Sequence, residues 1–197
     1  MLKEGHFDMN LTCVYFVRHA ESLFVKGQER TRGLSHRGFL DAQKVKYLLV
    51  KESIDYIYSS PYKRSIQTVQ PLSNAIHKEI IVKEDLRERL LAGDGLFTSD
   101  TFQQSKKIAY EDMNYSFCGG ESSKAAQKRA MQVLTKIMNE HQGMNIVIGT
   151  HGDIMTLMMN YFDQGYDFNF WKSTSMPDIY KLQFKVDKLI EVKRLWG

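Results

Sequence analysis

The segment "LTCVYFVRHA", residues 11–20, is the most informative part of the chain, because an almost unbroken apolar run ends there in the pair Arg18-His19. An apolar run without alternation is typical of a strand that is covered on both faces, as in a parallel sheet. A cation and an imidazole at the tip of such a strand indicate either a surface turn or the floor of an anion-binding site. The pattern of the remaining chain favours the second interpretation.

Strands and helices alternate along the rest of the chain. Further strands are predicted at residues 55–60, 79–84 and 145–150, and helices at about 36–51, 98–112, 122–141 and 153–163. Another helix is expected to begin at Pro61, a favourable first helical residue, and to be kinked by Pro71. The C-terminal stretch alternates apolar and polar residues on either side of Asp187-Lys188, which predicts a β-hairpin. This order predicts a three-layer α/β/α sandwich with a mostly parallel central sheet, formed by residues 1–197 as a single domain.

The composition is that of an ordinary globular protein. Of the 197 residues, 43% are hydrophobic and 25% are charged, which suits a soluble chain with one sizeable core. No apolar run approaches the roughly 20 residues that span a bilayer. The first residues, "MLKEGHFDMNLT", lack the apolar stretch of a signal peptide. We therefore expect a cytoplasmic protein that has no membrane partner.

The charge, the glycine pattern and the cysteines of the chain argue against several classes of ligand and cofactor. The net charge of +4 favours anionic partners, but no dense basic run is interleaved with aromatic residues, which argues against nucleic acid. No Gly-x-Gly-x-x-Gly follows the first strand, which disfavours a dinucleotide-binding enzyme. Cys13 lies in an apolar run, far from Cys118, so that neither a disulfide framework nor a metal site is expected.

Polar residues follow each of the four predicted parallel strands. Arg18 and His19 follow the first strand, Arg64 lies in the first helical turn after the second, and Glu88 and His151 follow the third and fourth. Ligands of open α/β sheets bind outside the carboxyl ends of the strands. We therefore expect these five side chains to converge at one edge of the sheet.

The chemistry that suits this set is phosphoryl transfer. The planar fork of an arginine matches phosphate oxygens and stays charged, and helices that begin nearby point backbone N–H groups at the same place. A neutral imidazole can attack phosphorus, and the two arginines disfavour a protonated His19. A protonated carboxyl group can donate its proton to the leaving oxygen.

Six motifs occur in the order of a known family. They are "VRHAES" (17–22), "LSHRGFLDA" (34–42), "YSSPYKRSIQT" (58–68), "LRERL" (86–90), "GGES" (119–122) and "GTHGD" (149–153). From about residue 14 to 155 the chain resembles the histidine phosphatase superfamily, in the phosphoglycerate-mutase-like branch that includes mutases and small phosphatases. The pair Arg18-His19 with His151 far downstream is specific as a set, whereas either part alone is a weak signal.

The resemblance implies a role for each of these residues. His19 would be the catalytic nucleophile that becomes phosphorylated, and Arg18, Arg64 and His151 would bind the phosphoryl group. Glu88 would be the general acid and later the base that activates water. The resemblance implies no metal and no organic cofactor.

Two positions depart from the family pattern. Ala20 stands where the family usually has glycine, which is a small change. Val25 stands where the family often has an asparagine near the phosphate, so that a polar contact is lost. Val25 is the one sequence feature that favours a non-catalytic phosphate-binding module.

The general acid has sequence alternatives to Glu88. Glu84 and Asp85 are close by in the chain, and either could serve or be a solvated charge. Glu88 is preferred because "LRER" matches the family context of the acid. Asp153 is another candidate, although a charge at a helix N-terminus is the favoured interpretation of this residue.

Two further segments could border the site. The basic loop residues either line the pocket mouth or are solvated charges: Lys26, Arg30, Arg32, His36 and Arg37. Residues 92–121 are a candidate lid. If they act as one, five aromatic residues form an apolar wall, and otherwise they are part of the core: Phe24, Phe97, Phe102, Tyr110 and Phe117. The pair Glu121-Ser122 is expected to be structural, with Ser122 or Ser123 capping the following helix.

The sequence thus predicts a cofactor-independent phosphatase that hydrolyses a small-molecule phosphate monoester through a phosphohistidine intermediate. Phosphoglycerate mutase activity is the second hypothesis, because dedicated mutases have a larger insert than the stretch from Leu91 to Gly119. A non-catalytic phosphate-binding module is the third. The sequence leaves the physiological substrate and the oligomeric state open.

Overall fold

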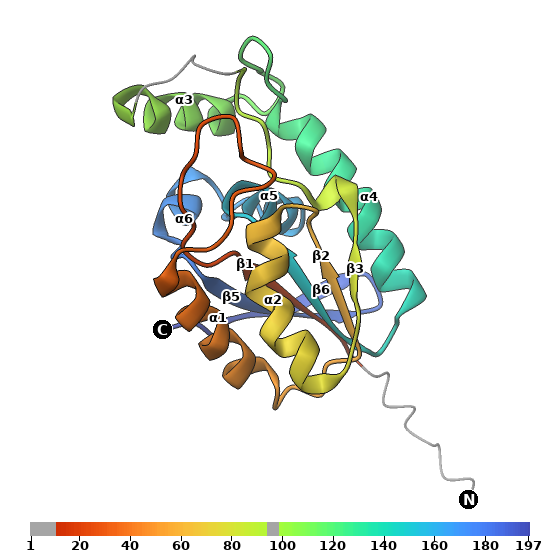
Figure 1. Cartoon of the computed structure of the whole chain (residues 1–197). Coiled ribbons are helices and arrows are strands. Elements are labelled where there is room, and N and C mark those ends of the chain that lie inside the picture. Colours follow the sequence, from red (N-terminus) through yellow and green to blue (C-terminus); the bar gives the residue numbers. More distant parts are fainter. Residues whose placement is uncertain (1–10, 94–98) are drawn as a thin grey trace, which may run out of the picture.

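A computed structural model of the chain describes residues 11–93 and 99–197, and within them the elements form a sheet with helices on both faces (Figure 1). The sheet has six strands in the order β3-β2-β4-β1-β5-β6. The bounds of the strands are β1 (Thr12–Arg18), β2 (Tyr56–Ser59), β3 (Ile80–Val82), β4 (Asn145–Thr150), β5 (Asp178–Lys185) and β6 (Lys188–Arg194). The first four strands in chain order are parallel, whereas β5 runs antiparallel to β1 and β6 pairs with β5 as the predicted hairpin.

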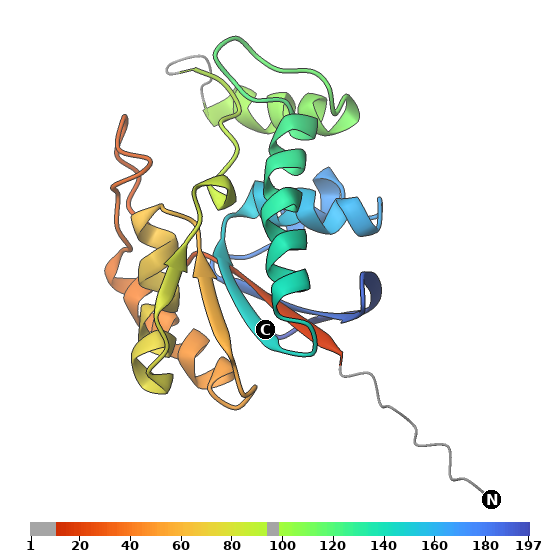
Figure 2. The same ribbon diagram turned by 90° about the vertical axis from the view of Figure 1, so that its right-hand side faces the viewer.

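Helices cover the two faces of this sheet. On one face lie α1 (His36–Leu49) and α2 (Lys63–Ile76), and on the other lie α4 (Ser123–Glu140) and α5 (Gly152–Phe162), as Figure 2 shows edge-on. The short helix α6 (Phe168–Ser173) packs beside α5, and η1 (Glu84–Leu86) is a single 3-10 turn after β3. The predicted three-layer α/β/α sandwich with a mostly parallel sheet is therefore confirmed.

Strand β1 explains why both layers of helices are needed. Its side chains alternate between the faces, so that Tyr15 and Val17 pack in the core beneath α1 and α2. Val14 and Phe16 pack in the core beneath α4 and α5. All four side chains are fully buried, as expected for an apolar run in a doubly covered strand. The burial of β1 fixes Arg18 and His19 at its carboxyl end.

Helix starts follow the capping signals with one exception. Ser35 Oγ accepts from Gly38 N at the start of α1, and Ser122 Oγ accepts from Ala125 N at the start of α4. The prediction that Pro61 is the first helical residue is wrong, because α2 begins at Lys63. Residues 60–62 are used to turn the chain out of β2, and Ser60 Oγ accepts from Tyr62 N in that turn.

The candidate lid contains helix α3 (Ser99–Glu111), which lies at the end of the molecule where β1 and β4 terminate. Its side chain Lys106 reaches Asp153 in the first turn of α5. Helix α6 was not predicted, because six residues give too short a periodic pattern. Within residues 11–93 and 99–197 no helix is long and apolar enough to cross a membrane.

Candidate active site

The two predicted site histidines lie side by side because their strands are neighbours in register. Arg18 of β1 is paired with Thr150 of β4, and the N–H of His19 donates to the carbonyl of Thr150 at 2.9 Å. His151 follows Thr150 directly. The ring centroids of His19 and His151 are 5.2 Å apart in an edge-to-face arrangement, and both residues are buried.

Hydrogen bonds fix the tautomer of His19. Its Nδ1 lies 2.8 Å from the carbonyl oxygen of Ala20, which can only accept, so Nδ1 carries the proton and the lone pair is on Nε2. Burial lowers the pKa of His19 well below its usual value, and the positive charge of Arg64 lowers it further. His19 is therefore a neutral imidazole with a free electron pair on Nε2.

His151 is held from the side of β2. Its Nε2 lies 2.7 Å from Ser60 Oγ, and burial together with Arg64 lowers the pKa of His151 well below its usual value. Among the described residues, no group makes a hydrogen bond with the buried Nδ1 of His151. A buried polar atom of this kind is suited to a ligand.

Arg64 enters the site from the first turn of α2. Its guanidinium is buried beside the ring of Tyr62, 4.9 Å from the ring centroid, and Nη1 donates to the carbonyl of Glu29. Burial and the nearby charge of Arg32 lower the pKa of Arg64 to about 10. Arg64 thus stays protonated near neutral pH.

Arg18 is held by two segments beyond the sheet. Its Nη1 donates to the carbonyl of Thr174 at 3.0 Å, in the turn between α6 and β5. Its guanidinium also lies against Gly152, where an added Cβ would come within 2.9 Å of Arg18 Cζ. Gly152, the second glycine of "GTHGD", therefore leaves room for Arg18 at the start of α5.

Glu88 is fastened to the N-terminus of α5, directly after His151. Its Oε1 accepts from Ile154 N at 3.0 Å and its Oε2 accepts from Asp153 N at 3.2 Å. Burial lowers the pKa of both Arg18 and Arg64, and the charge of Glu88 acts in the opposite direction on both, since the carboxylate faces the same space as these arginines. The structure thus brings together all five residues that the sequence predicted to converge.

The alternative carboxylates lie in other surroundings. Glu84 is exposed and pairs with Arg30, and Asp85 pairs with Arg87 at 2.7 Å. Asp153 is buried among Arg89, Lys106 and Tyr110. Burial acts to raise the pKa of Asp153, but the charges of Lys106 and Arg89 outweigh it and lower this pKa to about 2. Such a carboxylate is permanently ionised and cannot serve as a proton donor near neutral pH.

Of the five basic residues that could line the pocket mouth, one lies near the site and four point to solvent or to another partner. Arg32 is near the site, since its charge lowers the pKa of both His19 and His151. Lys26 is exposed, Arg30 is drawn to Glu84, and His36 and Arg37 are exposed at the start of α1. Val25 is 40% exposed.

The proposed apolar wall is incomplete. Phe24 is 76% exposed, so it belongs to neither a wall nor the core. Phe102 packs on Trp171, Tyr110 lies near Phe168, and Phe117 packs on Tyr115. Phe97 lies outside the described residues.

Several residues around the site were missed by sequence reasoning. Ser60 could have been found, because it directly precedes Pro61 in the motif "SSP" at a strand end. Arg89, Lys106 and Thr174 carry no local signal, since only tertiary contacts bring them to the site. No cluster of three or more His, Cys, Asp or Glu residues that could hold a metal ion occurs in the part of the chain that the structure describes.

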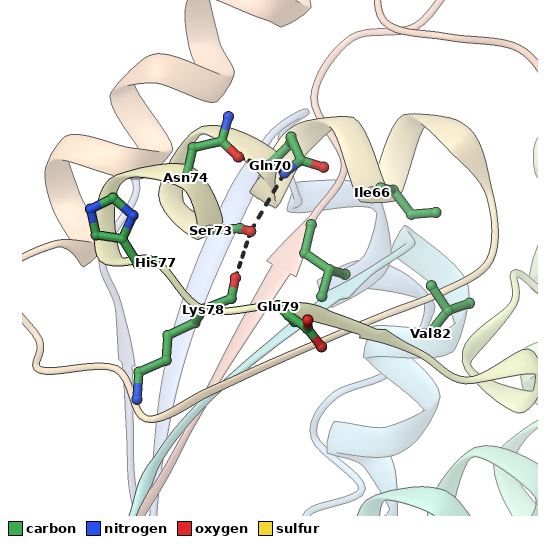
Figure 3. A pocket seen from close by; sticks show the side chains of 9 residues that line it. Ile66, Gln70, Ser73, Asn74, His77, Lys78, Glu79 and Val82 are labelled. Carbon is green, nitrogen blue, oxygen red and sulfur yellow. Dashed lines mark hydrogen bonds between the residues drawn. The ribbon is translucent and has the colours of Figure 1, made fainter.

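A surface groove of about 740 Å³ lies elsewhere, between the second half of α2 and β3 (Figure 3). Its polar groups bond with one another: Gln70 Nε2 donates to Asn74 Oδ1, and Ser73 Oγ donates to the carbonyl of Lys78. His77 is at the end of α2 opposite to Arg64. We therefore assign no part of the anion site to this groove.

The fold and the site together define a class of α/β protein in which two neutral histidines, two arginines and a carboxylate meet at the carboxyl edge of the sheet. The family model of the histidine phosphatase superfamily (branch 1) matches residues 14–189. The chain belongs to this family, and the resemblance seen in the sequence is confirmed.

Three known proteins illustrate the range of the likeness. Phosphoglycerate mutase-like protein 4 of Arabidopsis thaliana is 30% identical over 173 residues, which cover 78% of this chain and 74% of the relative. Phosphoserine phosphatase 1 of Hydrogenobacter thermophilus is 30% identical over 146 residues, 68% of each chain. The structure of mycobacterial glucosyl-3-phosphoglycerate phosphatase superposes with a TM-score of 0.76 at 17% identity, covering 93% of this chain and 97% of that one.

Proposed function

We propose that the protein is a phosphatase that hydrolyses a small-molecule phosphate monoester through a phosphohistidine on His19. The observation that carries this proposal is the state of His19, a buried neutral imidazole whose Nδ1 proton is held by the Ala20 carbonyl. Nε2 is thereby left as the nucleophile. The names of two relatives, phosphoserine phosphatases of Hydrogenobacter thermophilus, support hydrolysis.

In the first step, the lone pair of His19 Nε2 forms a bond to phosphorus while the bond from phosphorus to the ester oxygen breaks. Protonated Glu88 gives its proton to the departing oxygen, so that an alcohol leaves. Arg18 and Arg64 compensate the charge on the phosphoryl oxygens. When the Ser60 hydroxyl donates a hydrogen bond to Nε2 of neutral His151, the ring proton of His151 is on Nδ1, which can then donate to a phosphoryl oxygen.

In the second step, a water molecule attacks the phosphorus of phosphohistidine. Glu88, now a carboxylate, takes a proton from this water, and the bond from phosphorus to His19 Nε2 breaks. Inorganic phosphate leaves, while His19 and protonated Glu88 are restored. For a monoester whose leaving alcohol must be protonated, the first step needs a protonated Glu88, so we expect activity on such substrates to favour mildly acidic pH.

Hydrolysis of p-nitrophenyl phosphate from pH 5 to 8 with EDTA present tests the proposal. Turnover by the wild-type protein that is lost in His19→Ala would support a histidine phosphatase that needs no divalent metal. Wild-type turnover that persists in His19→Ala, or that EDTA abolishes, would contradict it. The absence of cofactors and the cytoplasmic location stay predictions, as do the single domain and the role of residues 92–121 as a lid.

Mutase activity is kept as the second candidate because one relative is named phosphoglycerate mutase-like. A mutase must retain its product and return the phosphoryl group to it. Mass spectrometry of 2- and 3-phosphoglycerate during incubation separates the two activities, since a mutase interconverts them and a phosphatase releases phosphate. Phosphoserine is the first natural monoester that we would test.

A further inference from the structure

A carboxylate of the basic loop lies between two arginines at the site. Glu29 Oε2 is 3.1 Å from Arg32 Nη2 and 3.4 Å from Arg64 Nη2. The backbone carbonyl of Glu29 also accepts from Arg64 Nη1. One carboxylate oxygen is thus shared by two guanidinium groups that come from different segments of the chain.

Arg32 is held toward the site rather than toward solvent. Only 14% of its side chain is exposed, and its Nη1 donates to Ser22 Oγ, three residues after His19. Its positive charge acts on His19, His151 and Arg64. Arg30, two residues earlier, differs in each respect, because its half-exposed side chain pairs with Glu84.

Two guanidinium groups so close to each other repel unless an anion lies between them. Glu29 supplies that anion, but 46% of its side chain is exposed, so the carboxylate can turn outward at small cost. A phosphoryl group presents the same kind of oxygen acceptors and a larger charge.

We propose that Arg32 is a third arginine that binds the phosphoryl group, and that Glu29 occupies its place until a phosphorylated ligand displaces the carboxylate. This inference rests on the proposed function, because it assigns one more residue to the same site. It makes opposite predictions for two neighbouring side chains: loss of Arg32 weakens phosphate binding, and loss of the Glu29 charge strengthens it.

The test measures the Kd of inorganic phosphate by ³¹P NMR titration, which needs no turnover. The variants are Arg32→Gln, Arg32→Lys and Glu29→Gln, with Lys51→Gln as a control that removes one exposed positive charge at the opposite end of the sheet. Glu29→Gln keeps the backbone carbonyl that accepts from Arg64, so any change in the Kd of phosphate in this variant is due to the loss of the carboxylate charge. Circular dichroism and thermal melting verify that each variant is folded.

We expect the Kd of phosphate to rise about tenfold or more in Arg32→Gln and less in Arg32→Lys, which keeps the charge without the fork. We expect the Kd to fall up to about fivefold in Glu29→Gln, and to stay unchanged in Lys51→Gln. A fall in affinity in both Arg32→Gln and Glu29→Gln would show a structural role only and overturn the proposal.

Two other results would also overturn it. One is a wild-type protein that binds no phosphate, and the other is an effect of Arg32→Gln on phosphoserine alone, which would assign Arg32 to the substrate carboxylate. Failure of the proposed function is a separate outcome: phosphate binds and responds to the variants as expected, but no monoester is hydrolysed.

Discussion

At the scale of the single residue, the site depends on where protons and side-chain volumes are placed. The carbonyl of Ala20 fixes the tautomer of His19, and the absence of a side chain at Gly152 makes room for Arg18. Motif reasoning predicted the residues themselves, since Arg18 ends β1 and the other four come after strands: His19, Arg64, Glu88 and His151. It offered Arg32 only as one of five basic loop residues that either line the pocket mouth or are solvated, and it did not predict Glu29 as the partner of Arg32, because loop conformation decides both.

The pH dependence of the first step should reflect the low pKa of His19. Burial and Arg64 lower this pKa well below its usual value, so His19 takes up a proton only at a correspondingly lower pH. We expect kcat/KM for p-nitrophenyl phosphate to show no acid limb near pH 6.5, the usual histidine value. A profile of kcat/KM from pH 4.5 to 8 is the measurement, and a decline on acidification centred near pH 6.5 would contradict the prediction.

The substitution Glu88→Gln tests the general acid. We expect kcat/KM for an alkyl phosphate such as phosphoserine to fall by about 10²–10⁴, and to fall less for p-nitrophenyl phosphate, whose leaving group needs no proton. Glu84→Gln is the matched control, because Glu84 is exposed and paired with Arg30. Equal losses on both substrates would show that Glu88 does not protonate the leaving group.

The substitution Gly152→Ala tests the packing of Arg18. The added Cβ would meet Arg18 Cζ at 2.9 Å, so the guanidinium must shift. Because small misplacements in a site are costly, we expect kcat/KM to fall about 100-fold. Steady-state kinetics is the measurement, and an unchanged kcat/KM would show that Arg18 can shift without loss.

At the scale of the element, buried strands and capped helices were predicted within a few residues. Strand β1 and the caps at Ser35 and Ser122 carry strong local signals. The start of α2 was misplaced because Pro61 suits a turn as well as a helix. The packing of α3 against α5 depends on the ion pair between Lys106 and Asp153, which are far apart in the sequence, so no local pattern predicts it.

Helix α3 is fastened to α5 by a buried ion pair. The ammonium of Lys106 lies over the rings of Phe102 and Trp171 and pairs with the carboxylate of Asp153. Arg89 pairs with the same carboxylate. We expect Lys106→Met to lower the free energy of unfolding by about 1–3 kcal/mol. Hydrogen exchange should become faster in α3 and stay unchanged in the middle of α4, and uniform exchange rates in both helices would contradict this local role.

At the scale of the whole molecule, the sheet order explains how distant segments form one site. Strand β4 lies between β1 and β2, so His151 arrives between the segments that carry His19 and Arg64. The alternation of strands and helices along the chain predicted the layers and the parallel sheet, and the C-terminal apolar–polar pattern predicted the hairpin, because each strand has a local sequence pattern. Neither pattern could predict the order of strands, which depends on how the layers pack together.

The central position of β4 has a consequence for biosynthesis. Everything up to Glu88 leaves the ribosome before β4, yet β1 and β2 are each paired with β4 and not with each other. A nascent chain that ends before Asn145 therefore holds four of the five site residues without the strand that joins them. The set of five side chains is complete only once β4 and the His151 that follows it have been synthesised.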